Sequence, residues 1–155
     1  MIRLKKMNEG EFAVYMQDAV QSLADELSRA HDLPPAGGLE MARASFDSLL
    51  PEGRPDAKNQ FLYSIVNDEF QIGVLWFGVR RESGRDEAYV WDLLIYPPYR
   101  GKGFGKLAML ELEKIVRELG LASISLNVFG HNERARHMYV SLGYKTVAIR
   151  MRKFI

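Results

Sequence analysis

The feature that most constrains this chain is a glycine-rich loop within residues 93–106. Residues 93–95 are apolar and indicate the end of a strand, two prolines mark a turn, and Gly101, Gly103 and Gly105 precede an amphipathic helix. Such a loop leaves backbone N–H groups exposed at the positive end of a helix dipole, where phosphate or pyrophosphate binds. Glycines at alternate positions let the backbone approach a ligand without side chains in the way. The sequence therefore predicts an anion-binding site between a strand and a helix.

Two common phosphate-binding motifs do not fit this loop. The dinucleotide fingerprint G-x-G-x-x-G needs a glycine at position 106, where the chain has Lys106. The nucleotide P-loop needs a glycine at position 100 and a Ser or Thr at position 107, where the chain has Arg100 and Leu107. The pattern that fits is Arg-x-x-Gly-x-Gly, directly after a strand. A glycine-rich turn that merely connects a strand to a helix is the competing interpretation.

Length and composition bound the class of protein. The chain has 155 residues, 47% hydrophobic and 26% charged, which suits one soluble globular domain with its own core. A net charge of +1 gives no reason to expect nucleic-acid binding, no apolar run is long enough to cross a membrane, and the N-terminus does not resemble a signal peptide. The absence of cysteine excludes a cysteine nucleophile, and the spacing of the three histidines suggests no metal site. We therefore expect a cytoplasmic protein without metal, nucleic-acid or membrane partners.

Hydrophobic periodicity predicts the order of the secondary-structure elements. The expected strands are residues 2–7, 60–66, 71–79, 87–96, 122–129 and 144–154, and the expected helices are residues 9–27, 39–50, 105–120 and 132–142. Residues 31–38 are expected to form a loop and residues 81–86 a polar hairpin connection. The order is β-α-α-β-β-β-α-β-α-β. A meander that leads into a β-α-β unit predicts a mixed sheet with helices on both faces, an α/β (α+β mixed sheet) fold.

A second motif follows the strand expected at residues 122–129. The chain has Asn132, Ala135 and Tyr139 in the spacing Asn-x-x-Ala-x-x-x-Tyr, followed by Gly143 and Tyr144. Ala135 and Tyr139 are four residues apart, so they share one face of a helix, and the small Ala135 leaves room beside it for an extended ligand. Taken alone, Tyr139 would be a core tyrosine and Asn132 a helix N-cap. Both motifs, however, lie in order around one β-α-β unit.

The two motifs and the element order resemble those of the GNAT superfamily of N-acetyltransferases. The resemblance is specific from about residue 87 to residue 144 and only topological before that. It implies a single GNAT-like N-acetyltransferase domain over residues 1–155 that transfers an acetyl group from acetyl-CoA to a primary amine of a small molecule or peptide, by direct attack in a ternary complex. At family level it also implies a homodimer through the last strand. The alternatives are a non-catalytic acyl-CoA-binding or sensing domain on the same fold and a phosphate-binding α/β protein of another family.

The resemblance also implies roles for individual residues. The implied cofactor-binding residues are Leu93, Leu94, Ile95, Arg100, Gly101, Lys102, Gly103, Phe104, Gly105, Lys106, Asn132, Ala135 and Tyr139. Tyr139 is the candidate general acid, because a phenol of pKa about 10 suits a leaving thiol of pKa about 8.5. The attacking amine must be neutral, and Asp92 is the first candidate base, with Glu87 as the alternative. A substrate-positioning charge or a simple salt bridge is an equal interpretation of either carboxylate. No motif identifies the acceptor.

Overall fold

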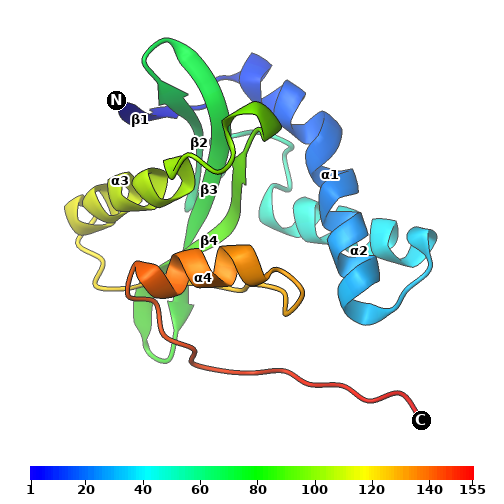
Figure 1. The fold of residues 1–155 in the computed structure, drawn as a ribbon. Helices are drawn as coiled ribbons and strands as arrows, with labels where there is room; N and C mark the ends of the chain where they lie inside the picture. Colours follow the sequence, from blue (N-terminus) through cyan, green and yellow to red (C-terminus); the bar gives the residue numbers. More distant parts are fainter.

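A five-stranded mixed sheet organises residues 1–155 in the computed structural model (Figure 1). The elements are β1 (Ile2–Lys6), α1 (Glu9–His31), α2 (Pro35–Leu49), β2 (Gln60–Asn67), β3 (Phe70–Glu82), β4 (Arg85–Ile95), a 3-10 turn (Pro97–Tyr99), α3 (Phe104–Glu118), β5 (Ile124–Leu126) and α4 (Glu133–Ser141). The strands lie side by side in chain order, the first four antiparallel and β5 parallel to β4. This confirms the predicted mixed sheet. No helix combines the length and the apolar character needed to cross a membrane.

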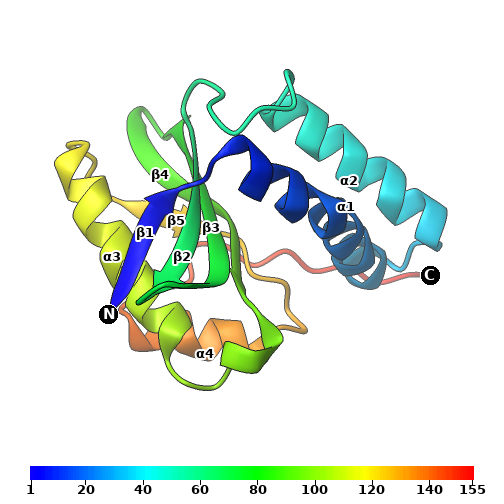
Figure 2. The same cartoon turned by 90° about the horizontal axis from the view of Figure 1, so that it is seen from above.

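Helices cover both faces of the sheet, and Figure 2 shows α1 and α2 on one side with α3 on the other. Successive side chains of a strand point to opposite faces, and β3 illustrates the consequence. Val74 and Trp76 belong to the buried cluster under α1 and α2, whereas Leu75 and Phe77 belong to the cluster under α3. The helix α4 also packs on the α3 side, through partly buried residues that include Tyr139. The sheet therefore separates two cores.

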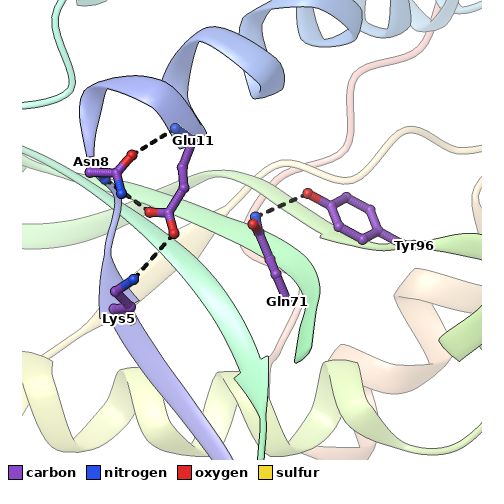
Figure 3. Close-up of polar contacts among 5 residues, drawn as sticks. All are labelled: Lys5, Asn8, Glu11, Gln71 and Tyr96. Atoms are coloured by element: carbon purple, nitrogen blue, oxygen red, sulfur yellow. Dashed lines mark hydrogen bonds and ion pairs between the residues drawn. The ribbon is translucent and has the colours of Figure 1, made fainter. Parts of the chain in front are cut away.

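A capping box fixes the start of α1 (Figure 3). The side chain of Asn8 accepts a hydrogen bond from the Glu11 N–H at 2.8 Å, and the Glu11 carboxylate accepts one from the Asn8 N–H at 2.9 Å. That hydrogen bond, together with the nearby Lys5 ammonium, lowers the pKa of Glu11. Figure 3 also shows Gln71 donating to the Tyr96 hydroxyl at 3.1 Å, which ties the residue after β4 to β3. Asn8 thus begins the helix where the sequence predicts it.

The N-terminal helices are longer than predicted. The helix α1 continues to His31, and α2 begins at Pro35, so the loop predicted over residues 31–38 is wrong. Proline suits the first turn of a helix because the N–H that it lacks has no partner there. Gly38 lies where the two helices cross, since a Cβ on it would stand 2.4 Å from the Ala24 carbonyl oxygen. Gly38, which suggested a loop, instead permits close packing of α1 and α2.

The end of the chain also differs from the prediction. The strand predicted over residues 144–154 is absent, because no neighbouring strand pairs with this segment in the single chain. Tyr144 still packs edge-on against Tyr139, with 5.6 Å between ring centroids. Beyond it, every residue from 145 to 155 is exposed, and Figure 1 shows this red segment running away from the helices and the sheet. The strand predicted over residues 122–129 is shorter too, spanning only Ile124–Leu126.

Candidate functional site

The sheet opens along the second half of β4. Residues 88–90 pair with β5, whereas residues beyond them pair only with β3. The register between β3 and β4 shifts at this point, because Trp76 pairs with Asp92 while the next residue of β3 pairs with Val90. Trp91 is therefore the extra residue of a β-bulge, which bends a strand and redirects its side chains. The bulge leaves the edge at Leu93, Leu94 and Ile95, which the resemblance implies as cofactor-binding residues, without a neighbouring strand.

The backbone groups of Leu93 and Ile95 face this open edge. The Tyr96 N–H donates to the Ile72 carbonyl of β3 at 2.9 Å, and backbone groups alternate in direction along a strand. The groups of Ile95 and Leu93 therefore point away from β3. Arg100 Nε donates to the Ile95 carbonyl at 2.7 Å, which agrees with that direction and ties the loop to the strand. The N–H of Leu93 therefore lies on the side of the open edge, near enough to the Asp92 carboxylate to lower its pKa.

The glycine loop begins beside this edge and leads into α3. Gly101 and Gly103 have φ angles of 78° and 80°, in the left-handed region that glycine adopts without strain. No backbone N–H from Gly101 to Lys106 donates to another backbone group, and the first bond of the helix runs from Leu107 to the Gly103 carbonyl at 3.2 Å. Consecutive free donors at a helix N-terminus form a site for an anion. The loop therefore has the geometry that the sequence predicts.

Basic side chains surround the loop. Arg100, Lys102 and Lys106 come from the loop itself and are exposed. Arg134 of α4 adds a positive charge that the sequence did not predict here. Its Nη2 lies 3.4 Å from the position that a Cβ on Gly101 would take. The only signal in the sequence is its place within the Asn132–Tyr139 motif, in the first turn of α4. Of the predicted loop residues, Phe104 instead packs against the core under α3.

The second motif opens α4 beside the loop. Asn132 is the N-cap, and its side-chain oxygen accepts a hydrogen bond from the Ala135 N–H at 3.2 Å. The side-chain amide of Asn132 keeps its N–H donors. Gly105 permits the close approach of α3 and α4, since a Cβ on it would lie 3.1 Å from Met138 Sδ. The predicted residues of the two motifs are thus brought together, with Asn132 exposed and Ala135 half-buried.

Tyr139 lies on the inner side of α4 and is half-buried. Burial of the hydroxyl, with a smaller contribution from the negative charge of Asp92, raises the pKa of Tyr139 to about 12. The phenol therefore keeps its proton at neutral pH, as a proton donor must. The effect of Asp92 on this pKa also means that the two candidate catalytic residues, which come from different elements, lie near one another.

Asp92 lies under α1, with its carboxyl group enclosed although the residue as a whole is half-buried. The Tyr15 hydroxyl donates to Asp92 Oδ2 at 2.6 Å, across 77 positions of sequence. Burial raises the pKa of Asp92, and the hydrogen bond from Tyr15 opposes that rise. Burial, followed by the charge of Asp92, also raises the pKa of Tyr15. In the sequence, only the place of Tyr15 on the apolar face of α1 distinguishes it.

Glu87 lies in the other half of β4 and has other partners. Its Oε1 accepts hydrogen bonds from Arg80 Nε at 3.1 Å and from Ser125 Oγ at 2.6 Å, and the residue is buried. The Arg80 guanidinium also lies 3.8 Å from the centre of the Tyr89 ring. This arrangement links β3, β4 and β5 and favours the salt-bridge interpretation of Glu87. Asp92 is the carboxylate beside the open edge.

Known proteins share both the sequence pattern and the fold. The pattern of the acetyltransferase (GNAT) family matches residues 22–144. The chain belongs to the GNAT family. YdgE of Bacillus subtilis, described as an uncharacterised N-acetyltransferase, is 32% identical over 151 residues, covering 97% of this chain and 96% of YdgE. The crystal structure of YycN from the same organism superposes with a TM-score of 0.92 at 31% identity, covering 100% of this chain and 99% of that one.

Membership of the GNAT family makes the chain an acyltransferase and confirms the predicted fold class. A structure from Pyrococcus furiosus, with a TM-score of 0.72 and 21% identity, shares the fold alone. GNAT enzymes generally use acetyl-CoA together with an acceptor substrate. The open edge of β4, the glycine loop and the start of α4 thus form the candidate active site of a GNAT enzyme.

Proposed function

We propose that this protein transfers the acetyl group of acetyl-CoA to a primary amine, of a small molecule or a peptide, by direct attack in a ternary complex. The observation that carries the proposal is the open edge at Leu93–Ile95, with the free N–H groups of residues 101–106 at one end. An extended chain bearing amides can add to an open strand edge as another strand would. A pyrophosphate suits N–H donors at a helix N-terminus. The pantetheine arm and the pyrophosphate of CoA offer these two groups.

The surrounding residues support the same cofactor. Arg100, Lys102, Lys106 and Arg134 supply positive charge beside the free N–H groups. The amide of Asn132 keeps donors near the start of α4, and Ala135 leaves space on the adjoining face of that helix. The outward N–H of Leu93 is a fixed donor that can stabilise negative charge on the thioester oxygen when the amine attacks.

Asp92 and Tyr139 supply the two proton transfers that the reaction needs. The amine nitrogen attacks the thioester carbonyl carbon, forming a C–N bond, and its surplus proton passes to Asp92, directly or through water. The C–S bond then breaks, and the sulfur takes the hydroxyl proton of Tyr139. The proton held by Asp92 afterwards restores the Tyr139 hydroxyl through solvent. Each proton that leaves one group thus reaches another, and the products are an amide and free CoA.

The two residues are coupled through the charge of Asp92. That charge contributes to the raised pKa of Tyr139, after burial. When Asp92 accepts the proton of the amine it becomes neutral, and this contribution disappears. The Tyr139 phenol is then more acidic at the stage when the thiolate leaves. The amine reaches the site neutral, so Asp92 takes only the one surplus proton that its nitrogen carries after the attack.

The test is the Tyr139→Phe variant, assayed by release of CoA thiol with a panel of primary amines. The chain has no cysteine, so the protein adds no thiol background. Loss of a general acid should lower kcat by about 10²- to 10⁴-fold and leave the KM for acetyl-CoA almost unchanged. Tyr144→Phe is the matched control, because Tyr144 packs against Tyr139 yet has no role in the proposed proton transfers.

Three results would contradict parts of the proposal. An unchanged kcat in Tyr139→Phe at every pH would exclude the acid role. Binding of acetyl-CoA without CoA release for any amine in the panel would favour the alternative of a non-catalytic acyl-CoA-binding domain. Thermal stabilisation by ATP or NAD but not by CoA would reject acetyl-CoA as the ligand of the glycine loop.

A further inference from the structure

The β-bulge in β4 places two consecutive side chains on one face of the sheet. Along a regular strand, neighbouring side chains point to opposite faces, but the register shift at Trp91 breaks this alternation. The centroid of the Trp91 ring lies 6.2 Å from that of Trp76, which belongs to the buried cluster under α1 and α2. The Asp92 carboxylate accepts a hydrogen bond from Tyr15 of the same cluster. Trp91 and Asp92 therefore both lie on the α1 and α2 side of the sheet.

The indole of Trp91 stays partly exposed on this face. Trp91 is 36% exposed, whereas Trp76, the other tryptophan of the chain, is 2% exposed. Neither Trp91 nor Tyr89 belongs to the two buried clusters under the helices. Tyr89 supports the indole instead, because the two ring centroids lie 4.4 Å apart with 61° between the ring planes, an edge-to-face contact. The Trp91 ring is thus packed against Tyr89 and still accessible to solvent.

The carboxylates around this face already have partners or a role. Glu87 is paired with Arg80, whose Nε lies 3.1 Å from Glu87 Oε1. Glu26, on the face of α1 that covers Asp92, has its Oε2 2.7 Å from His131 Nε2. Asp92 receives the proton of the amine in the proposed reaction. This distribution favours an uncharged group beside the exposed indole over a second positive charge.

We propose that the acceptor is a primary amine that carries an aromatic ring, and that this ring packs against the exposed part of the Trp91 indole while the amine nitrogen lies at Asp92. The inference rests on the proposed function, because it takes Asp92 as the group that receives the proton. With the two side chains adjacent on one face, a nitrogen beside Asp92 leaves the rest of a short amine beside Trp91. An aromatic ring suits that position because aromatic pairs favour offset-stacked and edge-to-face contacts, as Trp91 and Tyr89 already show.

The position of Trp91 distinguishes it from the other exposed aromatic side chains. Single exposed apolar residues are common on protein surfaces, and Phe70 is 68% exposed. Phe70, however, is the first residue of β3 and lies outside the candidate site. Trp91 directly precedes the candidate base and shares its face of the sheet. This adjacency makes Trp91 the residue that determines specificity for the acceptor.

The test compares two primary amines that differ only in a phenyl ring, phenethylamine and ethylamine, by release of CoA thiol at saturating acetyl-CoA. In the wild-type protein, kcat/KM should be higher for phenethylamine on the order of tenfold or more, because one well-packed apolar group supplies that much discrimination. Trp91→Ala should lower the ratio of the two kcat/KM values on the order of tenfold. The kcat/KM for ethylamine and the KM for acetyl-CoA should change by no more than about twofold, since neither depends on the indole.

Two variants control for the loss of a large side chain. Trp91→Phe keeps an aromatic ring and should retain the preference for phenethylamine to within about threefold. Phe70→Ala removes an exposed aromatic ring outside the candidate site and should leave the ratio of the kcat/KM values unchanged. Thermal unfolding of the three variants shows that each is folded at the temperature of the assay.

Fluorescence tests the contact in the unmodified protein. Because Trp76 is buried, quenching of tryptophan fluorescence by acrylamide should report mainly on Trp91. In protein saturated with CoA, phenethylamine should protect Trp91 from the quencher, whereas ethylamine should not. Trp91→Phe, which keeps only the buried Trp76, should show no response to either amine. Quenching that saturating phenethylamine leaves unchanged would overturn the inference.

The kinetic outcomes separate this inference from the proposed function. Equal kcat/KM values for the two amines in the wild-type protein, or a preference for phenethylamine that persists in Trp91→Ala, would overturn the inference and leave acetyl transfer intact. A preference for ethylenediamine over phenethylamine would also overturn it and would indicate that the site takes a second cation. Absence of CoA release with every amine would reject the proposed function and this inference with it.

Discussion

The two halves of β4 differ on either side of Trp91. In the first half, residues 88–90 have strands on both edges and are buried; in the second, residues 92–95 have a strand on one edge and are half-buried. Each half carries one shielded carboxylate, Glu87 in the first and Asp92 in the second, whereas Asp86 at the start of the strand is exposed. Glu87 has a guanidinium and a hydroxyl as partners, whereas Asp92 accepts a hydrogen bond from the Tyr15 hydroxyl and has no cationic partner. A carboxylate that is enclosed without a cationic partner is under less constraint to stay charged, so it can accept a proton.

The largest effect on kcat should come from replacing Asp92, the carboxylate in the second half of β4. We expect Asp92→Asn to lower kcat by about 10³-fold, because an amide cannot accept the proton of the attacking amine. The KM for acetyl-CoA should stay nearly constant, since Asp92 has no part in the proposed contacts with CoA. Steady-state kinetics with one amine at saturating acetyl-CoA measure this change.

The matched control is Glu87→Gln in the first half of the strand. It should keep kcat within about threefold, because Glu87 lies in an ion pair away from the open edge. If Glu87→Gln lost activity and Asp92→Asn kept it, Glu87 would be the base and the distinction between the two halves would be wrong.

The two halves of β4 should also differ in how well they tolerate an added methyl group on the neighbouring strand β3. The effect expected here is on the free energy of unfolding. A Cβ on Gly73 would lie 2.1 Å from the Leu94 carbonyl oxygen, which is backbone of the second half. A Cβ on Gly78 would meet the ends of side chains, with Trp91 Nε1 at 2.8 Å and Gln60 Oε1 at 2.9 Å. Because side-chain ends can move more easily than a strand, Gly73→Ala should cost about 3 kcal/mol and Gly78→Ala about 1 kcal/mol of unfolding free energy. Urea unfolding measures both, and equal losses would contradict the argument.

The parts of the site that the sequence predicted depend on local patterns. The glycine loop, the Asn132 cap and the placement of Tyr139 on a helix face follow from spacing within one β-α-β unit. The hydrogen bond from Tyr15 to Asp92 joins residues 77 positions apart, and a tyrosine on an apolar helix face is indistinguishable from a core residue. The sequence could identify Asp92 as a candidate base, but it could not show that Tyr15 of α1 covers the carboxyl group.

The errors in the fold have a related cause. Gly37 and Gly38 favour a loop by local propensity, yet both lie in α2, where Gly38 packs against Ala24 and Ser28 of α1. Residues 144–154 have the alternation of a strand, but a strand also needs a neighbour, which the single chain does not provide. In both places the local pattern of the segment was interpreted correctly, but the structure depends on a contact with another segment that the pattern does not contain.

The hydrogen bond to Asp92 gives the next prediction, with an expected effect of about tenfold on kcat. The Tyr15 hydroxyl lowers the pKa of Asp92 against the rise caused by burial. Tyr15→Phe should therefore raise that pKa further, and Asp92 must be deprotonated to act as the base. The acid limb of the kcat–pH profile should move to higher pH, with kcat about tenfold lower on that limb. Phe46→Leu, a change in the same core that leaves this hydrogen bond intact, should not move the limb. An unmoved limb in Tyr15→Phe would mean that Asp92 is not the titrating base.

The smallest expected effects are on stability, and they should have opposite signs for Asp92 and Glu87. Burial raises the pKa of Asp92 in the folded protein, so the folded state binds this proton more tightly than the unfolded state does. The resulting stabilisation is complete below the unfolded pKa of about 3.9 and is lost as pH rises through the folded value. At neutral pH the enclosed charge is a net cost, and Asp92→Asn should stabilise the protein by about 1 kcal/mol.

Glu87→Gln should instead destabilise the protein by about 1 kcal/mol, since it removes the charge that pairs with Arg80. Thermal unfolding at pH 4 and pH 7 tests both signs, because the gain from Asp92→Asn should shrink at the lower pH, where the raised pKa leaves less negative charge on the wild-type carboxyl. A loss of stability in Asp92→Asn at pH 7 would show that Asp92, like Glu87, is a structural carboxylate. The two halves of β4 would then differ in solvent exposure, and neither carboxylate would be the base of the reaction.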